Sequence, residues 1–305
     1  MSWYARKDRW DQKLGEQLLF GVMRSFEITT RWIDLWRLCR LLAPLGGWVI
    51  ATLPMTARRL KRNLALIHPE MPDDERSHLM RAIGRHVTQL AIEYTHFRRF
   101  LPAVRLAVDG IEAMVARAEA GQGQVIVSAH YANWEAIRVA LKERGVACGI
   151  IYRPFNNRPL DRYTLELIRA AGEPVMQKGP KGMRALHKHV ASGGAALVLV
   201  DQRNTGASMI DFLGHRAETV TVAAALARRT GAALVPAVAR RIDGRGGFSV
   251  RFETAVPDGE PEAMMAEVNR RIGAWIAEDP AQWFWLHNRW KRANDRRRAS
   301  AKNRS

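Results

Sequence analysis

The stretch VIVSAHYANWE, residues 125–135, decides how the rest of the chain is interpreted. Its first residues are β-branched and typical of a buried strand, whereas residues 134–141 are typical of a helix with Asn133 as its cap. His130 is therefore expected in a strand-to-helix turn. Inside one continuous helix His130 and Glu135 would point about 140° apart, because each residue advances about 100°. A turn between them lets the two side chains meet.

An imidazole beside a carboxylate is the arrangement of a general base, since the carboxylate holds the ring in one tautomer. A single histidine is more often a structural residue than a catalytic one, and this alternative applies to His130. Its place in the turn and the paired Glu135 favour the catalytic interpretation.

The composition limits the class of protein. At 305 residues the chain is long enough for one large core with a helical addition. Cys39 and Cys148 provide no disulfide framework, fit a reducing compartment and are expected to be packing residues. A net charge of +18 indicates an anionic partner: nucleic acid, an acidic lipid surface or an acidic carrier protein. Ten tryptophans, several of them beside arginines, favour a membrane interface.

Residues 14–42 are apolar and aromatic but carry a charged stripe at spacings of three and four, formed by Arg24, Glu27, Arg31 and Asp34. The longest charge-free run, residues 41–57, contains Pro44 and Pro54 and is shorter than the roughly 20 residues of a membrane-spanning helix. We therefore expect this region to lie on a membrane rather than cross it. A soluble helix packed on the rest of the domain is the alternative.

Helices are predicted over residues 56–67 and 73–100, on either side of a turn at residues 68–72. The basic run at residues 58–62 is able to contact phosphates, although a charged run is usually only a solvated face.

From residue 106 onward, short apolar runs alternate with amphipathic helices. Strands are predicted at residues 105–109, 124–128, 147–152, 173–176, 195–200, 232–239 and 247–255. This alternation predicts an α/β fold with a mostly parallel sheet flanked by helices. We expect an N-terminal helical, membrane-associating region over residues 1–100, an α/β core over residues 101–291 and a disordered basic tail over residues 292–305.

Active groups of such folds gather at the carboxyl ends of the strands. His130, Arg153 and Asp201 each follow a predicted strand and are expected to form one site. A structural ion pair between Arg153 and Asp201 is the alternative. The sequence lacks the spacing of a zinc site, so no metal is expected.

The ordered set of segments resembles the lauroyl/myristoyl acyltransferases of lipid A biosynthesis, a branch of the lysophospholipid acyltransferase superfamily. HYANWE, residues 130–135, is similar to the HxxxxE motif of that family. Other similar segments follow in the family's order: Asn63 with Leu64, Glu93, YRPFNN (152–157), Leu160 with Asp161, DQR (201–203), FLG (212–214), TGA (230–232) before Val235 with Pro236, and PAQWFWLHNRWK (280–291). The resemblance covers about residues 15–291. The glycerol-phosphate branch carries an FPEGTR block and an Asp in the second catalytic position; their absence argues against a simple lysophosphatidate acyltransferase.

The resemblance implies late acylation, in which a fatty acyl chain moves from the thioester of acyl carrier protein to a hydroxyl of a lipid A precursor. No cofactor is implied beyond the acyl thioester of acyl carrier protein or coenzyme A. Expected partners are acyl carrier protein, an anionic glycolipid acceptor and a membrane surface, with no nucleic acid. The implied location is the cytoplasmic face of the bacterial inner membrane, with the protein either peripheral or monotopic.

Within that expectation His130 is the general base and Glu135 stabilises the imidazolium, without an acyl-enzyme. Arg153 and Arg169 are candidate oxyanion donors; Arg153 alternatively binds an acceptor phosphate, and Asp201 orients Arg153 or an acceptor hydroxyl. The remaining expected substrate contacts are Asn156, Asn157, Gln202 and Arg203. Three alternatives stay open: transfer from acyl-CoA to another glycolipid or phospholipid, a thioesterase that uses the same base, and a nucleic-acid or anionic-surface binding protein.

Overall fold

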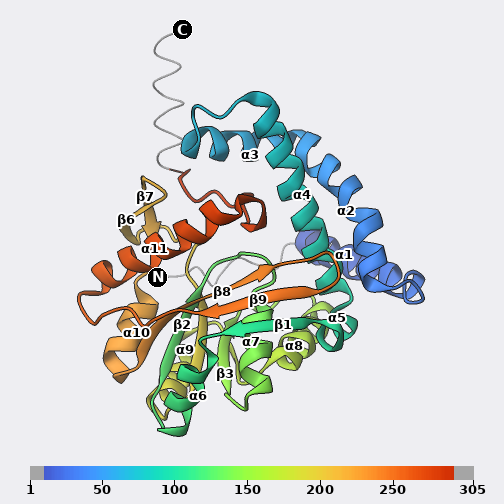
Figure 1. The fold of residues 1–305 in the computed structure, drawn as a ribbon. Coiled ribbons are helices and arrows are strands. Elements are labelled where there is room, and N and C mark those ends of the chain that lie inside the picture. The colour runs from blue at the N-terminus through green and yellow to red at the C-terminus, as the bar shows by residue number, and fades with distance from the viewer. Residues whose placement is uncertain (1–9, 292–305) are drawn as a thin grey trace.

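The computed structural model describes residues 10–291 and shows an α/β core with N-terminal helices lying across it (Figure 1). The seven predicted strands are found close to their expected positions: β1 (Arg105–Asp109), β2 (Gln124–Ser128), β3 (Cys148–Tyr152), β4 (Val175–Gln177), β5 (Ala195–Leu199), β8 (Ala233–Arg241) and β9 (Gly247–Phe252). They form one sheet in the order β1-β9-β8-β2-β5-β3-β4. Its neighbours are parallel except for β8 and β9. The predicted fold class is therefore confirmed.

Helices flank this sheet, and all of them except the last α-helix lead to the start of the next strand. They are α6 (Ile111–Glu119), α7 (Glu135–Glu143), α8 (Arg158–Ala171), α9 (Pro180–Ala191), α10 (Val222–Thr230) and α11 (Pro261–Glu278), followed by the short 3₁₀ helix η1 (Pro280–Gln282). β2 lies between β5 and β8 and is buried at every position. A strand covered on both faces is mostly apolar, which explains the β-branched run in the middle of β2.

The sequence prediction missed a two-stranded hairpin formed by β6 (Ser208–Phe212) and β7 (His215–Thr219). Leu213 (φ 54°) and Gly214 (φ 74°) form its turn, both in the left-handed region. Such a turn normally begins with Asn, Asp or Gly. A leucine in that place removes the signal that would have revealed the hairpin.

The N-terminal region is helical, as predicted. It contains α1 (Trp10–Thr29), α2 (Leu35–Thr52), α3 (Pro54–Ile67), α4 (Asp73–Thr95) and α5 (Phe97–Ala103). The helix predicted over residues 73–100 is divided at His96, between α4 and α5. The tail predicted over residues 292–305 lies outside the described residues.

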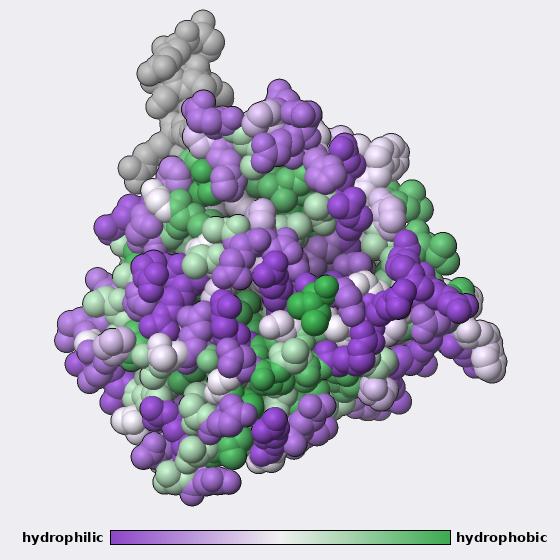
Figure 2. All heavy atoms as spheres, in the orientation of Figure 1, coloured by the Kyte–Doolittle hydropathy of each residue, from purple (hydrophilic) through white to green (hydrophobic). Residues whose placement is uncertain are grey.

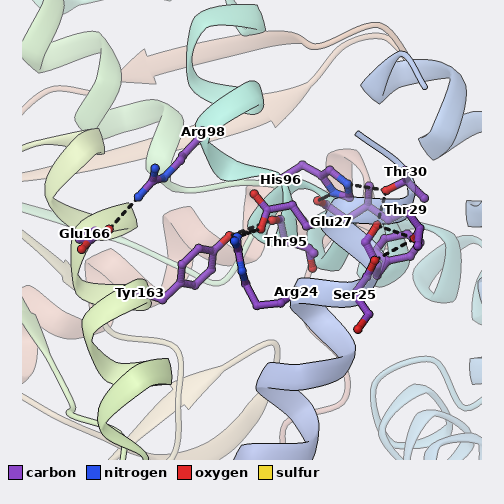
Figure 3. Close-up of polar contacts among 12 residues, drawn as sticks. Arg24, Ser25, Glu27, Thr29, Thr30, Thr95, His96, Arg98, Tyr163 and Glu166 are labelled. Atoms are coloured by element: carbon purple, nitrogen blue, oxygen red, sulfur yellow. Dashed lines mark hydrogen bonds and ion pairs between the residues drawn. The ribbon is translucent and has the colours of Figure 1, made fainter. Parts of the chain in front are cut away.

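Polar contacts join α1 to the core (Figure 3). The Tyr163 hydroxyl of α8 lies 3.1 Å from Glu27 Oε2 and 3.1 Å from the carbonyl oxygen of Thr95. At the end of α1, Thr30 Oγ1 lies 2.8 Å from His96 Nε2. The helix thus packs against α4 and α8.

The charged stripe expected over this region is divided between two helices. Arg24 pairs with Glu27 on the side of α1 that faces α8. Asp34 instead precedes α2, where its side chain accepts the N–H of Arg37 at 2.9 Å. The charged residues therefore stabilise two separate features, the packing of α1 against α8 and the N-terminus of α2.

α2 crosses α4 at a point where only glycine fits. A Cβ at Gly47 would lie 2.7 Å from the carbonyl oxygen of Arg81, and a Cβ at Gly84 would lie 2.7 Å from the carbonyl oxygen of Gly47. This close approach buries one face of α2. The opposite face remains exposed and carries Leu41, Leu45 and Trp48. Figure 2 shows hydrophobic residues on the rim of the molecule beside α2.

Among the described helices, none is by itself long and apolar enough to cross a membrane. α2 and α3 taken together have the required length and composition, but they are bent by 79° relative to each other.

Candidate active site

His130 lies in the turn between β2 and α7, as predicted. The turn is sharp, because Ala132 has a positive φ of 45°. Two backbone hydrogen bonds connect it to the C-terminal segment: the Ala132 N–H donates to the Gln282 carbonyl at 2.9 Å, and the Phe284 N–H donates to the His130 carbonyl at 3.0 Å. A segment far along the sequence therefore fixes the backbone of the histidine turn.

Asp201 follows β5, the strand beside β2, and is the carboxylate that contacts His130. Its Oδ1 lies 2.8 Å from His130 Nδ1, and its Oδ2 accepts the His130 backbone N–H at 2.9 Å. The indole N–H of Trp283 donates to Oδ2 at 2.8 Å. Burial alone would raise the pKa of Asp201, but the charge and hydrogen bonds of His130 and the bond from Trp283 outweigh it and hold that pKa below its usual value.

This contact assigns the tautomer of the imidazole. An ionised carboxylate can only accept hydrogen bonds, so Nδ1 of His130 carries a proton, and in the neutral ring Nε2 is the hydrogen-bond acceptor. The Gln202 amide nitrogen lies 3.1 Å from Nε2. The rings of Trp134 and Phe284 pack beside the imidazole at centroid distances of 4.8 and 6.4 Å. The His130 side chain remains 20% exposed, which leaves it accessible to a substrate.

Glu135 does not occupy the position expected from the motif. It begins α7 and is buried, and its Oε2 accepts a hydrogen bond from Arg138 at 2.8 Å. The Arg138 side chain is fully buried and also donates to the carbonyl groups of Ile168 and Gly172 at the end of α8. A buried guanidinium requires an anion, and Glu135 is the nearest one on the same helix. The two side chains of the motif thus diverge, and Asp201 takes the place predicted for Glu135.

A second buried network lies behind the turn. Asn133 was predicted to cap α7, but the N-cap is Trp134, one residue later. The Asn133 side-chain oxygen accepts the Glu135 N–H at 3.2 Å, and its amide donates to Glu93 Oε2 at 3.0 Å. Arg241 of β8 forms a two-point ion pair with Glu93. The network ties the start of α7 to α4 and to the end of β8.

Of the polar residues that follow β3, two are exposed and two have structural partners. Arg153 and Asn156 are exposed. A contact between Arg153 and Asp201 was expected, but the side chain of Asp201 is bonded to His130 and Trp283 instead. Asn157 is buried and caps α8 by accepting the Leu160 N–H at 2.9 Å. Arg169 lies in the last turn of α8, 3.5 Å from Glu173, at the end of the helix remote from Arg153.

Arg203 is partly buried and pairs with Glu218 of β7. Its backbone N–H donates to His287 Nε2 at 2.8 Å. Burial lowers the pKa of His287 to about 4, so this ring is neutral. The ion pair indicates that Arg203 positions the segment after Asp201.

The prediction from sequence missed the role of the C-terminal segment. Trp283, Trp285 and Trp290 are buried in a cluster with Phe212, with ring centroids 4.8 to 6.3 Å apart. This packing places the Trp283 indole N–H on Asp201. The high density of tryptophan in residues 280–291 is the sequence feature from which this packing could have been predicted.

The cysteines are packing residues, as expected. Cys39 and Cys148 are both buried and unbridged, and burial raises the pKa of each thiol to about 12. Neither forms a thiolate at neutral pH.

The fold and the site together define an α/β protein with a partly exposed histidine held by a buried carboxylate at the carboxyl edge of its sheet. Residues 35–292 match the family described as bacterial lipid A biosynthesis acyltransferase. The chain belongs to this family and is an acyltransferase.

Two curated proteins illustrate the similarity. The lipid A biosynthesis lauroyltransferase of Escherichia coli (strain K12) is 28% identical over 271 residues, which cover 83% of this chain and 84% of that protein. The phosphatidylinositol mannoside acyltransferase of Mycolicibacterium smegmatis is 27% identical over 258 residues, covering 79% and 82%. Among solved structures, the 1-acyl-sn-glycerophosphate acyltransferase of Thermotoga maritima aligns with 82% of this chain and 99% of that chain, at 13% identity and a TM-score of 0.36.

Proposed function

We propose that this protein carries out late acylation, the transfer of a fatty acyl chain from acyl carrier protein to a hydroxyl of a lipid A precursor. The observation that carries the proposal is the contact between His130 Nδ1 and Asp201, which leaves Nε2 as an accessible base. Membership of the acyltransferase family and the similarity to the lauroyltransferase of Escherichia coli support the choice of reaction and acceptor.

In the proposed step, Nε2 of His130 accepts the proton of the acceptor hydroxyl while the oxygen attacks the thioester carbonyl. Asp201 stabilises the imidazolium that forms. The tetrahedral intermediate then expels the thiolate, which takes up the proton from Nε2, and an ester and a free thiol result. No acyl-enzyme is required: Ser128 of the same turn is buried in β2, and both cysteine thiols are buried.

The oxyanion requires a hydrogen-bond donor close to Nε2. The Gln202 amide supports this role by its distance of 3.1 Å from that atom. Exposed Arg153 at the end of β3 is suited to an acceptor phosphate, since a guanidinium binds phosphate with two hydrogen bonds. Asn156 is exposed on the same loop and is proposed to contact the acceptor. Glu135 acts indirectly, by holding Arg138 and the start of α7 beneath the histidine turn.

The net charge of +18 supports the proposed partners, because acyl carrier protein and a phosphorylated glycolipid are both anionic. The proposed location is the cytoplasmic face of the bacterial inner membrane, where the protein is peripheral. The exposed apolar face of α2 supports contact with a lipid surface.

A second candidate acceptor is a phosphoinositol-based glycolipid, with acyl-CoA as donor. The identity to the Mycolicibacterium smegmatis protein, 27%, is close to the 28% identity to the lauroyltransferase and favours keeping this candidate. Both acceptors are anionic glycolipids, so the same base serves either reaction.

Purified protein is incubated with an acyl thioester of acyl carrier protein or coenzyme A, with or without each glycolipid, and the lipids are analysed by mass spectrometry. We expect an acylated lipid A precursor with the carrier-protein donor, and no product with His130→Ala. Undiminished transfer by His130→Ala would refute the base. Hydrolysis that is unaffected by the acceptor would indicate a thioesterase instead.

A further inference from the structure

A cavity of about 340 Å³ lies in the corner between α2, α3 and α4, and none of the residues that line it belongs to the His130 site. Its volume is within the range of about 300 to 1,000 Å³ that is typical of small-ligand pockets. Two cations, two hydroxyl groups and two large apolar side chains account for most of the lining: Lys61, Arg81, Thr52, Ser77, Trp48 and Met80. The lining contains no acidic residue. The cavity is therefore suited to an anion.

Both cations are available for a ligand. Within residues 10–291 neither Lys61 nor Arg81 makes an ion pair or a hydrogen bond through its side chain. The rest of the basic run behaves differently: Arg59 donates to the Leu286 carbonyl at 3.1 Å, and Arg62 donates to Asn288 at 3.2 Å. Those two arginines hold the C-terminal segment, whereas Lys61 faces the cavity.

The same corner carries an exposed apolar surface. Leu45, Trp48, Leu53 and Met55 lie at the end of α2 and the start of α3, with Met55 71% and Trp48 57% exposed. Trp48 belongs both to this surface and to the cavity wall. An amphipathic ring in such a place is typical of a membrane interface. The exposed apolar surface at the end of α2 therefore adjoins the cavity that contains the charges of Lys61 and Arg81, which are unpaired among the described residues.

We propose that the corner of α2, α3 and α4 binds an anionic phospholipid of the membrane on which the protein rests. Lys61 and Arg81 bind the phosphate, the hydroxyl of Ser77 donates to it, and the acyl chains lie against Leu53 and Met55. A phospholipid matches both parts of the corner, whereas a free phosphate would use only the cavity. The site does not depend on the proposed acyl transfer, because it contains no residue of the His130 site.

The test measures binding of the full-length protein to two kinds of vesicle, phosphatidylcholine alone and phosphatidylcholine mixed with phosphatidylglycerol. We expect the wild type to prefer the mixed vesicles. Each basic side chain near an anionic surface contributes roughly a five-fold gain in binding, so Lys61→Gln with Arg81→Gln should lower the preference about 25-fold.

The matched control removes the same charge elsewhere. Arg184→Gln with Lys188→Gln lies on α9, at the opposite end of the molecule from α3 in Figure 1. Charges on exposed side chains are screened over about 8 to 10 Å at moderate salt, and we expect less than about a two-fold change from this control. Equal losses in the two double variants would mean that only overall charge matters and would overturn the proposal.

A further variant tests the cavity itself without changing charge. Ser77→Leu fills part of the hollow, and we expect a lower preference for phosphatidylglycerol with an unchanged melting temperature. An unchanged preference would exclude the cavity as the binding place. If inorganic phosphate abolishes the preference at low concentration, the ligand is a free phosphate rather than a lipid. All variants are expected to keep acyl transfer to a detergent-dispersed acceptor, so failure of this site and failure of the proposed function are distinguishable.

Discussion

Asp201 holds His130 at two points, accepting the backbone N–H on Oδ2 at 2.9 Å and the imidazole Nδ1 on Oδ1 at 2.8 Å. One carboxylate at the end of β5 therefore fixes both the turn and the ring at the end of β2. The tautomer of the base and its position in the site depend on the same side chain. This relationship assigns to Asp201 the orienting role that the motif spacing suggested for Glu135.

We expect Asp201→Asn to lower kcat by about 10²- to 10⁴-fold, the range that a general base contributes, with little change in KM. The amide is neutral and its NH₂ group cannot accept the Nδ1 proton, so the ring is free to adopt the tautomer that protonates Nε2. Steady-state kinetics over a pH series provide the measurement. An equal rise in KM with constant kcat would assign Asp201 to acceptor binding instead.

For Glu135→Ala we expect a loss of about 3 to 5 kcal/mol of unfolding free energy, because the variant leaves the charge of Arg138 buried without its partner. Replacing both residues, Glu135→Leu with Arg138→Met, should recover most of that loss. Urea denaturation of the single and double variants gives these values.

The same pair separates a positioning role from a catalytic one. Glu135→Gln keeps the shape of the side chain, and its folded fraction should retain kcat within about ten-fold, far more than His130→Ala retains. If Glu135→Gln were as stable as the wild type and as inactive as His130→Ala, the carboxylate would act in the chemistry itself.

Stability should fall as the pH decreases from about 6.5 to about 4, because burial lowers the pKa of His287 from 6.5 to about 4. The unfolded chain binds a proton in this window while the folded chain does not, so the free energy of unfolding rises with pH across it. Buried His86, with a pKa lowered to about 3, acts in the same direction. In urea titrations between pH 7 and pH 4, His287→Asn should make the unfolding free energy depend less steeply on pH. The same slope as in the wild type would show that His287 is not the group responsible.

The alternation of apolar runs was sufficient to predict the seven-stranded sheet, since strands that are covered by helices on both faces are mostly apolar. It also placed His130 and Asp201 at the same edge. The β6–β7 hairpin was not predictable in this way, because Leu213 occupies a turn position that normally signals itself by Asn, Asp or Gly.

The spacing of the motif also could not identify the carboxylate that contacts His130. A motif records separation along the chain, whereas the direction of the Glu135 side chain is set by Arg138, and that arginine is held by the end of α8. Likewise, the tryptophan block at residues 280–291 predicted apolar packing, but only the fold places Trp283 against Asp201.

Gln202→Ala tests the proposed oxyanion donor. Loss of one such donor typically lowers kcat by about 10² to 10³, and we expect a fall of that size with an unchanged melting temperature, because the side chain is exposed. Gln202→Met offers a similar side-chain length without the amide donor or a new charge and should behave alike. A rise in kcat for Gln202→Ala would show that the amide merely blocks Nε2 in the free enzyme.

Arg153→Ala should raise KM for the phosphorylated acceptor about ten- to hundred-fold and leave kcat nearly unchanged, because it removes a contact that is equally present in the ground state and the transition state. Arg169→Ala is the matched control: this arginine follows the same strand on α8 but lies at the far end of the helix, 3.5 Å from Glu173. Its removal should leave both constants within about two-fold, since an exposed ion pair contributes little. For an acceptor that lacks the phosphate, the wild type and Arg153→Ala should have the same KM. That result would identify the phosphate as the group that Arg153 binds. If Arg153→Ala and Arg169→Ala had the same effect, overall positive charge rather than a specific contact would govern acceptor binding.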